Sequence, residues 1–144
     1  MSTRKRIFVL DPGELSGFAI WNGASLTTGY FPHFEQLDYR VAASDMVVLE
    51  RPVGGKSTTK DIVFQVYGAC RERVYTLKKD IVIQEPSVPK TVFLQYNLSR
   101  QLKGMKTQHP KDAFMHLLFW LGKNQPEDVE KVLRLGKGKN YDSQ

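Results

Sequence analysis

Three carboxylates in this chain stand where an apolar run ends or a helical segment begins. Asp11 ends the apolar run 7–10, Glu50 ends the apolar run 46–49, and Asp112 opens a helical segment after His109-Pro110. Carboxylate oxygens are the hard ligands that Mg²⁺ and Mn²⁺ prefer. Paired ions of this kind stabilise both oxygens of an in-line phosphoryl displacement. The three acids are therefore candidate ligands of a catalytic two-metal site.

Each acid also has a purely structural explanation. Asp11 in Asp-Pro-Gly is a common turn residue, Glu50 can form a surface ion pair with Arg51, and Asp112 suits the positive end of a helix dipole. The recurrence of all three acids at the same kind of place favours a shared chemical role.

A polar stripe along the last long helix bears on the same question. At 100° per residue, Asp112 lies about 60° from His109, and His116 lies between them. The rest of this helix is apolar nearly all round, so it is predicted to be buried. The stripe must then face the sheet edge where Asp11 and Glu50 end, and His116 is expected to be a buried histidine with hydrogen-bond partners.

The elements that position these residues follow from hydrophobic periodicity and turn signals. Turn formers at 11–13 and 22–23 favour an antiparallel opening, and the uninterrupted apolar run 46–49 is typical of a strand buried on both faces. Gly68 and Ala69, in the middle of the clearest helix, are expected to allow close packing on the sheet. Strands are expected at 6–10, 17–22, 25–30, 46–49 and 81–84, and helices at 34–43, 60–78, 86–94, 110–121 and 126–135, before a frayed tail at 136–144.

This order predicts a mixed α/β protein with an antiparallel start and a parallel continuation. The length of 144 residues is enough for one domain spanning 1–144. Cys70 is the only cysteine, which rules out an intrachain disulfide and a thiolate zinc cage; its apolar surroundings indicate a buried, inert thiol. No signal-peptide core or membrane-spanning run is found, so we expect a soluble cytoplasmic protein with no membrane partner.

The basic balance points to a polyanionic partner. The net charge is +6 and the pI is about 9.5. Two groups of basic residues would flank the acids and neutralise phosphates on either side, although a solvated surface would look the same. The first group follows Glu50, and the second precedes or opens the last long helix; they comprise Arg51, Lys56 and Lys60, and Arg100, Lys103, Lys106 and Lys111.

Five segments resemble, in the same order, segments of the RuvC-type Holliday-junction resolvases, which belong to the RNase H-like nuclease superfamily. They are an apolar strand ending in Asp-Pro-Gly, a strand ending in a glutamate, a helix with Gly-Ala, a Pro-x-x-Val-Lys segment with proline in place of valine, and a His-x-x-Asp-Ala pattern. The resemblance covers roughly residues 7–121 and implies an RNase H-like fold, with a five-stranded mixed sheet flanked by helices. These segments lie at 7–17, 47–50, 66–69, 86–90 and 109–113.

The resemblance implies a crossover junction endodeoxyribonuclease that acts in DNA recombination and repair. Such an enzyme is a homodimer that binds four-way DNA junctions, and each subunit nicks one strand with magnesium or manganese. Carried over residue by residue, Asp11, Glu50 and Asp112 would be metal ligands, and His109 would complete the catalytic site. Lys90 would lie near the scissile phosphate and contact the DNA.

The chain also departs from the family pattern. The segment 51–55, Arg-Pro-Val-Gly-Gly, lacks the aromatic residue that wedges into the junction, and Val-Phe-Leu-Gln at 92–95 replaces an expected glycine. The chain is shorter than bacterial members, which suits a phage-encoded version. Two other functions stay open: an RNA-processing nuclease of the RuvC-like group, and a non-catalytic DNA-binding protein on the same fold, which predicts a missing acid.

Overall fold

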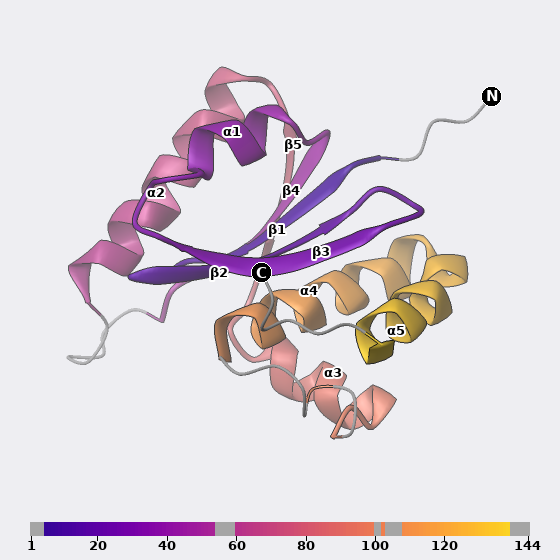
Figure 1. The fold of residues 1–144 in the computed structure, drawn as a ribbon. Coiled ribbons are helices and arrows are strands. Elements are labelled where there is room, and N and C mark those ends of the chain that lie inside the picture. The colour runs from indigo at the N-terminus through magenta and orange to yellow at the C-terminus, as the bar shows by residue number, and fades with distance from the viewer. Residues whose placement is uncertain (1–4, 54–59, 100–101, 103–107, 139–144) are drawn as a thin grey trace.

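The computed structural model describes residues 5–53, 60–99, 102 and 108–138 (Figure 1). The basic residues Lys56, Arg100, Lys103 and Lys106 lie outside the described residues. The elements in chain order are β1 (Ile7–Asp11), β2 (Leu15–Trp21), β3 (Leu26–Pro32), α1 (Leu37–Ala42), β4 (Met46–Glu50), α2 (Asp61–Thr76), β5 (Asp80–Gln84), α3 (Val88–Tyr96), α4 (Gln108–Asn124), the 3₁₀ turn η2 (Pro126–Asp128) and α5 (Val129–Gly138).

One five-stranded mixed sheet organises the molecule, in the order β3-β2-β1-β4-β5. The pairs β1–β2 and β2–β3 are antiparallel, whereas β1–β4 and β4–β5 are parallel. This confirms the predicted antiparallel start and parallel continuation. Leu10 pairs with Leu49 in parallel strands, so the residues that follow them, Asp11 and Glu50, lie side by side at the carboxyl ends of β1 and β4.

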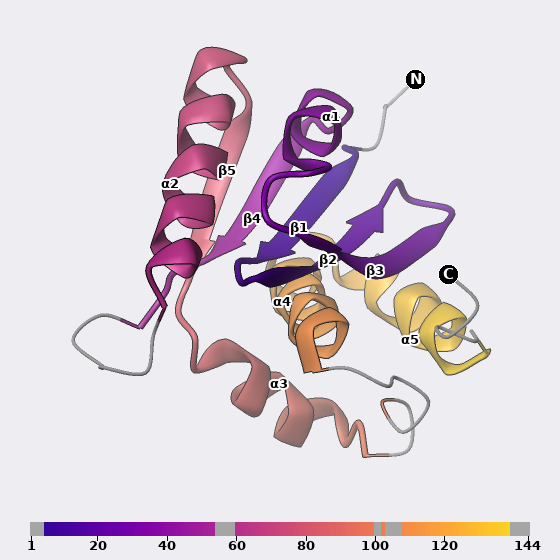
Figure 2. The ribbon, with the colours of Figure 1, turned by 60° about the vertical axis from the view of Figure 1, so that its left-hand side comes forward.

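Helices cover both faces of the sheet, with α1 and α2 on one side and α4, flanked by α3 and α5, on the other (Figures 1 and 2). Alternate residues of β1 and β4 point to opposite layers because side chains along a strand alternate. Phe8 and Val47 join the core under α2, whereas Val9 and Val48 pack against α4. The apolar run of β4 is thus buried on both faces, as predicted. Cys70 is fully buried, and burial raises the pKa of its thiol to about 12, which makes it inert.

The element bounds differ from the predicted ones mainly at chain turns. The strand expected at 25–30 continues to Pro32, because Pro32 still pairs with Leu15 of β2. His33 then adopts a positive φ of 50°, so the helix expected from residue 34 begins only at Leu37. Helix α4 begins two residues before Pro110 and ends at Asn124, and α5 takes in residues 136–138 of the expected tail.

Gly68 does not play the packing role expected from the sequence. A Cβ atom built at Gly68 meets no atom within 4 Å, and the residue is exposed. The sheet-facing side of α2 is instead formed by Val66, Cys70 and Val74. Glycine here costs helix stability without a packing gain.

Gly68→Ala is therefore expected to stabilise the protein by about 0.5–1 kcal/mol, because alanine loses less backbone entropy than glycine in a helix. Denaturant unfolding measures the change. Gly29→Ala is the matched control and should destabilise, since its Cβ would lie 3.0 Å from the buried Phe18 ring. A loss of stability in Gly68→Ala would contradict the assignment.

Candidate active site

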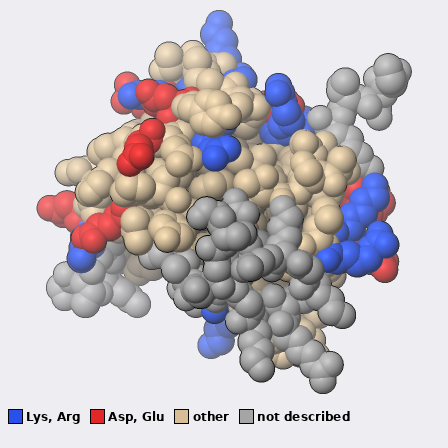
Figure 3. Space-filling view, viewed as in Figure 1, with Lys and Arg blue, Asp and Glu red and all other residues tan. Residues whose placement is uncertain are grey.

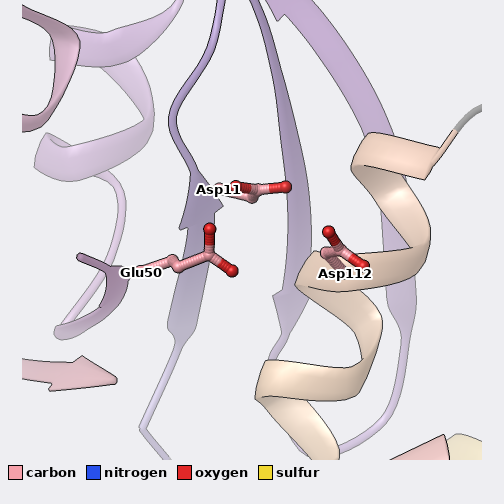
Figure 4. Close-up of side chains that lie close together, drawn as sticks. All are labelled: Asp11, Glu50 and Asp112. Carbon is pink, nitrogen blue, oxygen red and sulfur yellow. The ribbon is translucent and has the colours of Figure 1, made fainter. Parts of the chain in front are cut away.

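Three acids from distant parts of the chain converge at one edge of the sheet. Asp11 ends β1, Glu50 ends β4, and Asp112 lies near the start of α4. Each offers one carboxylate oxygen, and these oxygens all lie within 4.8 Å of one another. Figure 4 shows the three side chains directed into a shared space from two strands and one helix. The predicted convergence of the acids is thus observed in the geometry.

The electrostatics of this acidic cluster favour a cation. Asp11 is only 6% exposed, and Glu50 and Asp112 are half-buried. Burial raises the pKa of Asp11 well above its ordinary value, and the charge of Glu50, a hydrogen bond with Glu50 and the charge of Asp112 raise it further. Three carboxylates this close are costly when all are ionised, and a divalent cation would remove that cost. Their all-oxygen donor set fits Mg²⁺ or Mn²⁺.

His116 holds the Glu50 carboxylate in place. Its ring is fully buried on α4, with Nε2 2.6 Å from Glu50 Oε1 and Nδ1 2.5 Å from Gln84 Oε1. A carboxylate only accepts, so Nε2–H donates to Glu50. A neutral ring satisfies both partners when the Gln84 amide is turned so that its NH₂ group donates to Nδ1. The expected buried histidine with hydrogen-bond partners is found, and it links α4 to two strands.

Gln84 is the member of this network that sequence reasoning missed. It closes β5, pairs in register with Glu50, and is 6% exposed. The signal that singled out Asp11 and Glu50, a polar residue ending an apolar strand, is also present here. An amide at a strand end is a weaker indicator of a functional site than a carboxylate, because it carries no charge.

The other predicted site residues fall into separate environments. His109 lies in the first turn of α4, but its side chain is outside the described part of the structure. Arg51 pairs with Glu85 and not with Glu50, so the surface-pair explanation of Glu50 is wrong. Lys60 Nζ lies 2.6 Å from Glu14 Oε1.

Lys90 and Lys111 share a cavity with one of the three acids. Both line a cavity of about 500 Å³ between α3 and α4 whose wall includes Asp112. Lys90 is exposed and Lys111 is half-buried. The cavity thus joins the acidic cluster to a pair of cations.

Comparison with known proteins identifies the fold. No family model matches the chain, and no curated protein matches it in sequence. A solved structure of Thermus thermophilus RuvC in complex with a Holliday junction substrate is similar at 13% identity, with a TM-score of 0.58, covering 83% of this chain and 96% of that one. A second Thermus thermophilus RuvC structure has 14% identity and a TM-score of 0.52, covering 82% and 95%.

The chain therefore has the RuvC-like, RNase H-like α/β fold that the sequence predicts. At this level of identity the likeness concerns the fold alone. None of the described helices is long and apolar enough to cross a membrane.

Proposed function

We propose that the protein is a metal-dependent, structure-selective endodeoxyribonuclease that resolves four-way DNA junctions by paired nicks. The observation that carries this proposal is the convergence of Asp11, Glu50 and Asp112, with oxygens within 4.8 Å of one another, on a RuvC-like fold. The hypothesis of a non-catalytic protein on this fold predicts that one of these acids is missing, and all three are present.

The three acids would hold one or two Mg²⁺ or Mn²⁺ ions, with Asp11, the most buried, as the shared ligand. When bound, such ions stabilise the attacking and leaving oxygens of the phosphodiester. The chain's own groups supply the positioning. His116 orients Glu50 through the bond from Nε2–H, and Asp11 is itself buried from solvent. His109 remains a candidate fourth ligand.

Branched DNA is the substrate that the charge and the fold favour. The net charge is +6, yet basic and acidic side chains are interspersed on the face seen in Figure 3. We therefore expect the cations beside the acidic cluster to contribute more to DNA binding than a general basic patch. Lys90 and Lys111 would neutralise phosphates next to the acids, and Arg51 and Lys60 would act farther along the backbone.

Cleavage of a synthetic four-way junction in magnesium tests the proposal, with paired nicks expected from wild type and none from Glu50→Gln. Competition between junction DNA and structured RNA in a gel-shift assay distinguishes the DNA reading from the RNA-processing one. Failure of wild type to cut any branched DNA in magnesium or manganese would overturn the proposal.

We also propose that the protein acts as a homodimer, because paired nicks need two active sites. Strand β5 is one of the two edge strands of the sheet, and its Ile81 and Ile83 are 36% and 39% exposed. Phe64 on the neighbouring α2 is 42% exposed. An open edge strand beside exposed apolar side chains is a natural contact surface.

Ile83→Lys is expected to convert the dimer to a monomer, because a charge would be buried at that contact. Sedimentation measures the change. Leu94→Lys, on the exposed side of α3, is the control and should leave the dimer intact. A wild-type protein that is monomeric at all concentrations, with or without junction DNA, would contradict the proposal.

His116→Ala is expected to reduce the cleavage rate by roughly 10- to 100-fold and to raise the magnesium concentration needed for half-maximal activity, as is typical when a residue orienting a metal ligand is lost. A magnesium titration of initial rates measures both effects. Asn124→Ala, which removes an exposed hydrogen bond at the end of the same helix, should change neither. An unchanged magnesium dependence in His116→Ala would show that Glu50 is held in place without it.

A further inference from the structure

The cavity between α3 and α4 shares one wall with the acidic cluster. Asp112 is one of its lining residues, and so are the cations Lys90 and Lys111. Its volume of about 500 Å³ lies within the usual range of ligand-binding pockets. The remaining lining residues are apolar except for Ser99, and the apolar ones are Pro86, Pro89, Phe93, Leu102 and Met115.

We propose that this cavity binds an unpaired nucleotide adjoining the cleaved phosphodiester, with its base stacked on Phe93. The inference rests on the proposed nuclease function and names the part of the substrate that the site selects. Phe93 lines the cavity from α3 and has 36% of its surface exposed, so part of its ring is accessible to a ligand. Aromatic rings provide sequence-tolerant stacking surfaces because every base has a π-face.

The charges around the cavity match a nucleotide and not an uncharged ligand. Lys90 comes from the first turn of α3 and Lys111 directly precedes Asp112 on α4, so both helices present a cation to the same opening. A phosphodiester at Asp112 would carry its adjoining sugar and base into this cavity. Backbone phosphates would then lie beside the two lysines while the base meets the apolar walls.

This occupancy has a consequence for substrate choice. A base inside a regular duplex is paired and stacked, so it can enter the cavity only after leaving the stack, at a cost of a few kcal/mol. That cost is least where pairing is already broken. The cavity would therefore favour cleavage beside unpaired nucleotides, such as those at a branch point, over cleavage within a continuous duplex.

A double-mutant cycle between protein and DNA tests the proposal. Branched DNA is made with an abasic residue placed at one position at a time around the branch point, and Phe93→Ala removes the ring. Binding is measured by fluorescence anisotropy in an Asp11→Asn background, so that the DNA stays intact. At one position, removing the base or the ring alone should weaken binding roughly 5- to 150-fold, and removing both should weaken it no further.

Two control variants distinguish a loss of base stacking from a general disturbance of the fold. Phe93→Tyr keeps an aromatic face and should retain the coupling, whereas Leu94→Ala, on an exposed neighbour outside the cavity, should leave binding unchanged. Additive losses at every abasic position, or no loss in Phe93→Ala, would overturn the inference while leaving the nuclease proposal intact. Absence of any branched-DNA binding would overturn both.

Discussion

Asp11→Asn is expected to lower the rate of junction cleavage by at least about 10³-fold, which corresponds to roughly 4 kcal/mol of lost transition-state stabilisation. Asp11 ends β1 and is the most buried of the three converging acids. An amide keeps the shape of the side chain but removes the charge that holds a divalent cation. Single-turnover cleavage of a labelled junction measures the effect.

Asp80→Asn is the matched control for this substitution. Asp80 is exposed at the start of β5 and pairs with Lys5 at 3.0 Å, far from the acidic cluster in the fold. Exposed pairs contribute little to stability, so this variant should cleave at the wild-type rate. Wild-type activity in Asp11→Asn would place the catalytic centre elsewhere.

Asp11→Asn is also expected to stabilise the metal-free protein, by roughly 0.5–2 kcal/mol at neutral pH. Burial and the neighbouring carboxylates raise the pKa of Asp11 in the folded state. A group with a raised folded pKa contributes stability that is fully present below its unfolded pKa and is lost as pH rises through the folded value. The raised pKa of Asp11 therefore lowers the stability of the metal-free fold at neutral pH, and asparagine removes that penalty.

Thermal unfolding in chelator across the acidic to neutral range measures this effect. Wild type should lose stability as the pH rises, and Asp11→Asn should lose less of it. Magnesium should raise the melting temperature of wild type more than that of Asp11→Asn, because ligand binding stabilises the folded state by mass action. Equal melting temperatures of wild type and Asp11→Asn in chelator at neutral pH would contradict the proposed destabilisation by Asp11, whatever the variant does to cleavage.

The positions of the acids on their elements were predictable because they depend on local patterns. The apolar runs before Asp11 and Glu50 are continuous, and hydrophobic continuity identifies a buried strand without knowledge of its neighbours. The stripe on the last long helix follows from helical geometry alone, and His116 lies where that stripe predicts. Both inferences concern residues that are close together in sequence.

The errors arose where the outcome depended on neighbours in space. Gly68 was expected to face the sheet, but the orientation of α2 puts Val66 and Cys70 there instead. Arg51 follows Glu50 in sequence yet pairs with Glu85, because the parallel pairing of β4 and β5 brings the ends of these strands together. Sequence adjacency is a poor guide to ion pairs at strand ends.

Local patterns of residue type are enough to predict which residues end the strands, which face of the last long helix is polar, and that the chain forms a mixed α/β fold. The packing of the elements, in contrast, makes β1 and β4 neighbours, brings Asp112 on α4 to the end of these two strands, and lets Gln84 complete the support of Glu50 through His116. The cavity beside Asp112 likewise exists only because α3 and α4 pack together. Periodicity reports burial along one element, whereas contacts between elements depend on strand order and helix packing, which no local pattern encodes.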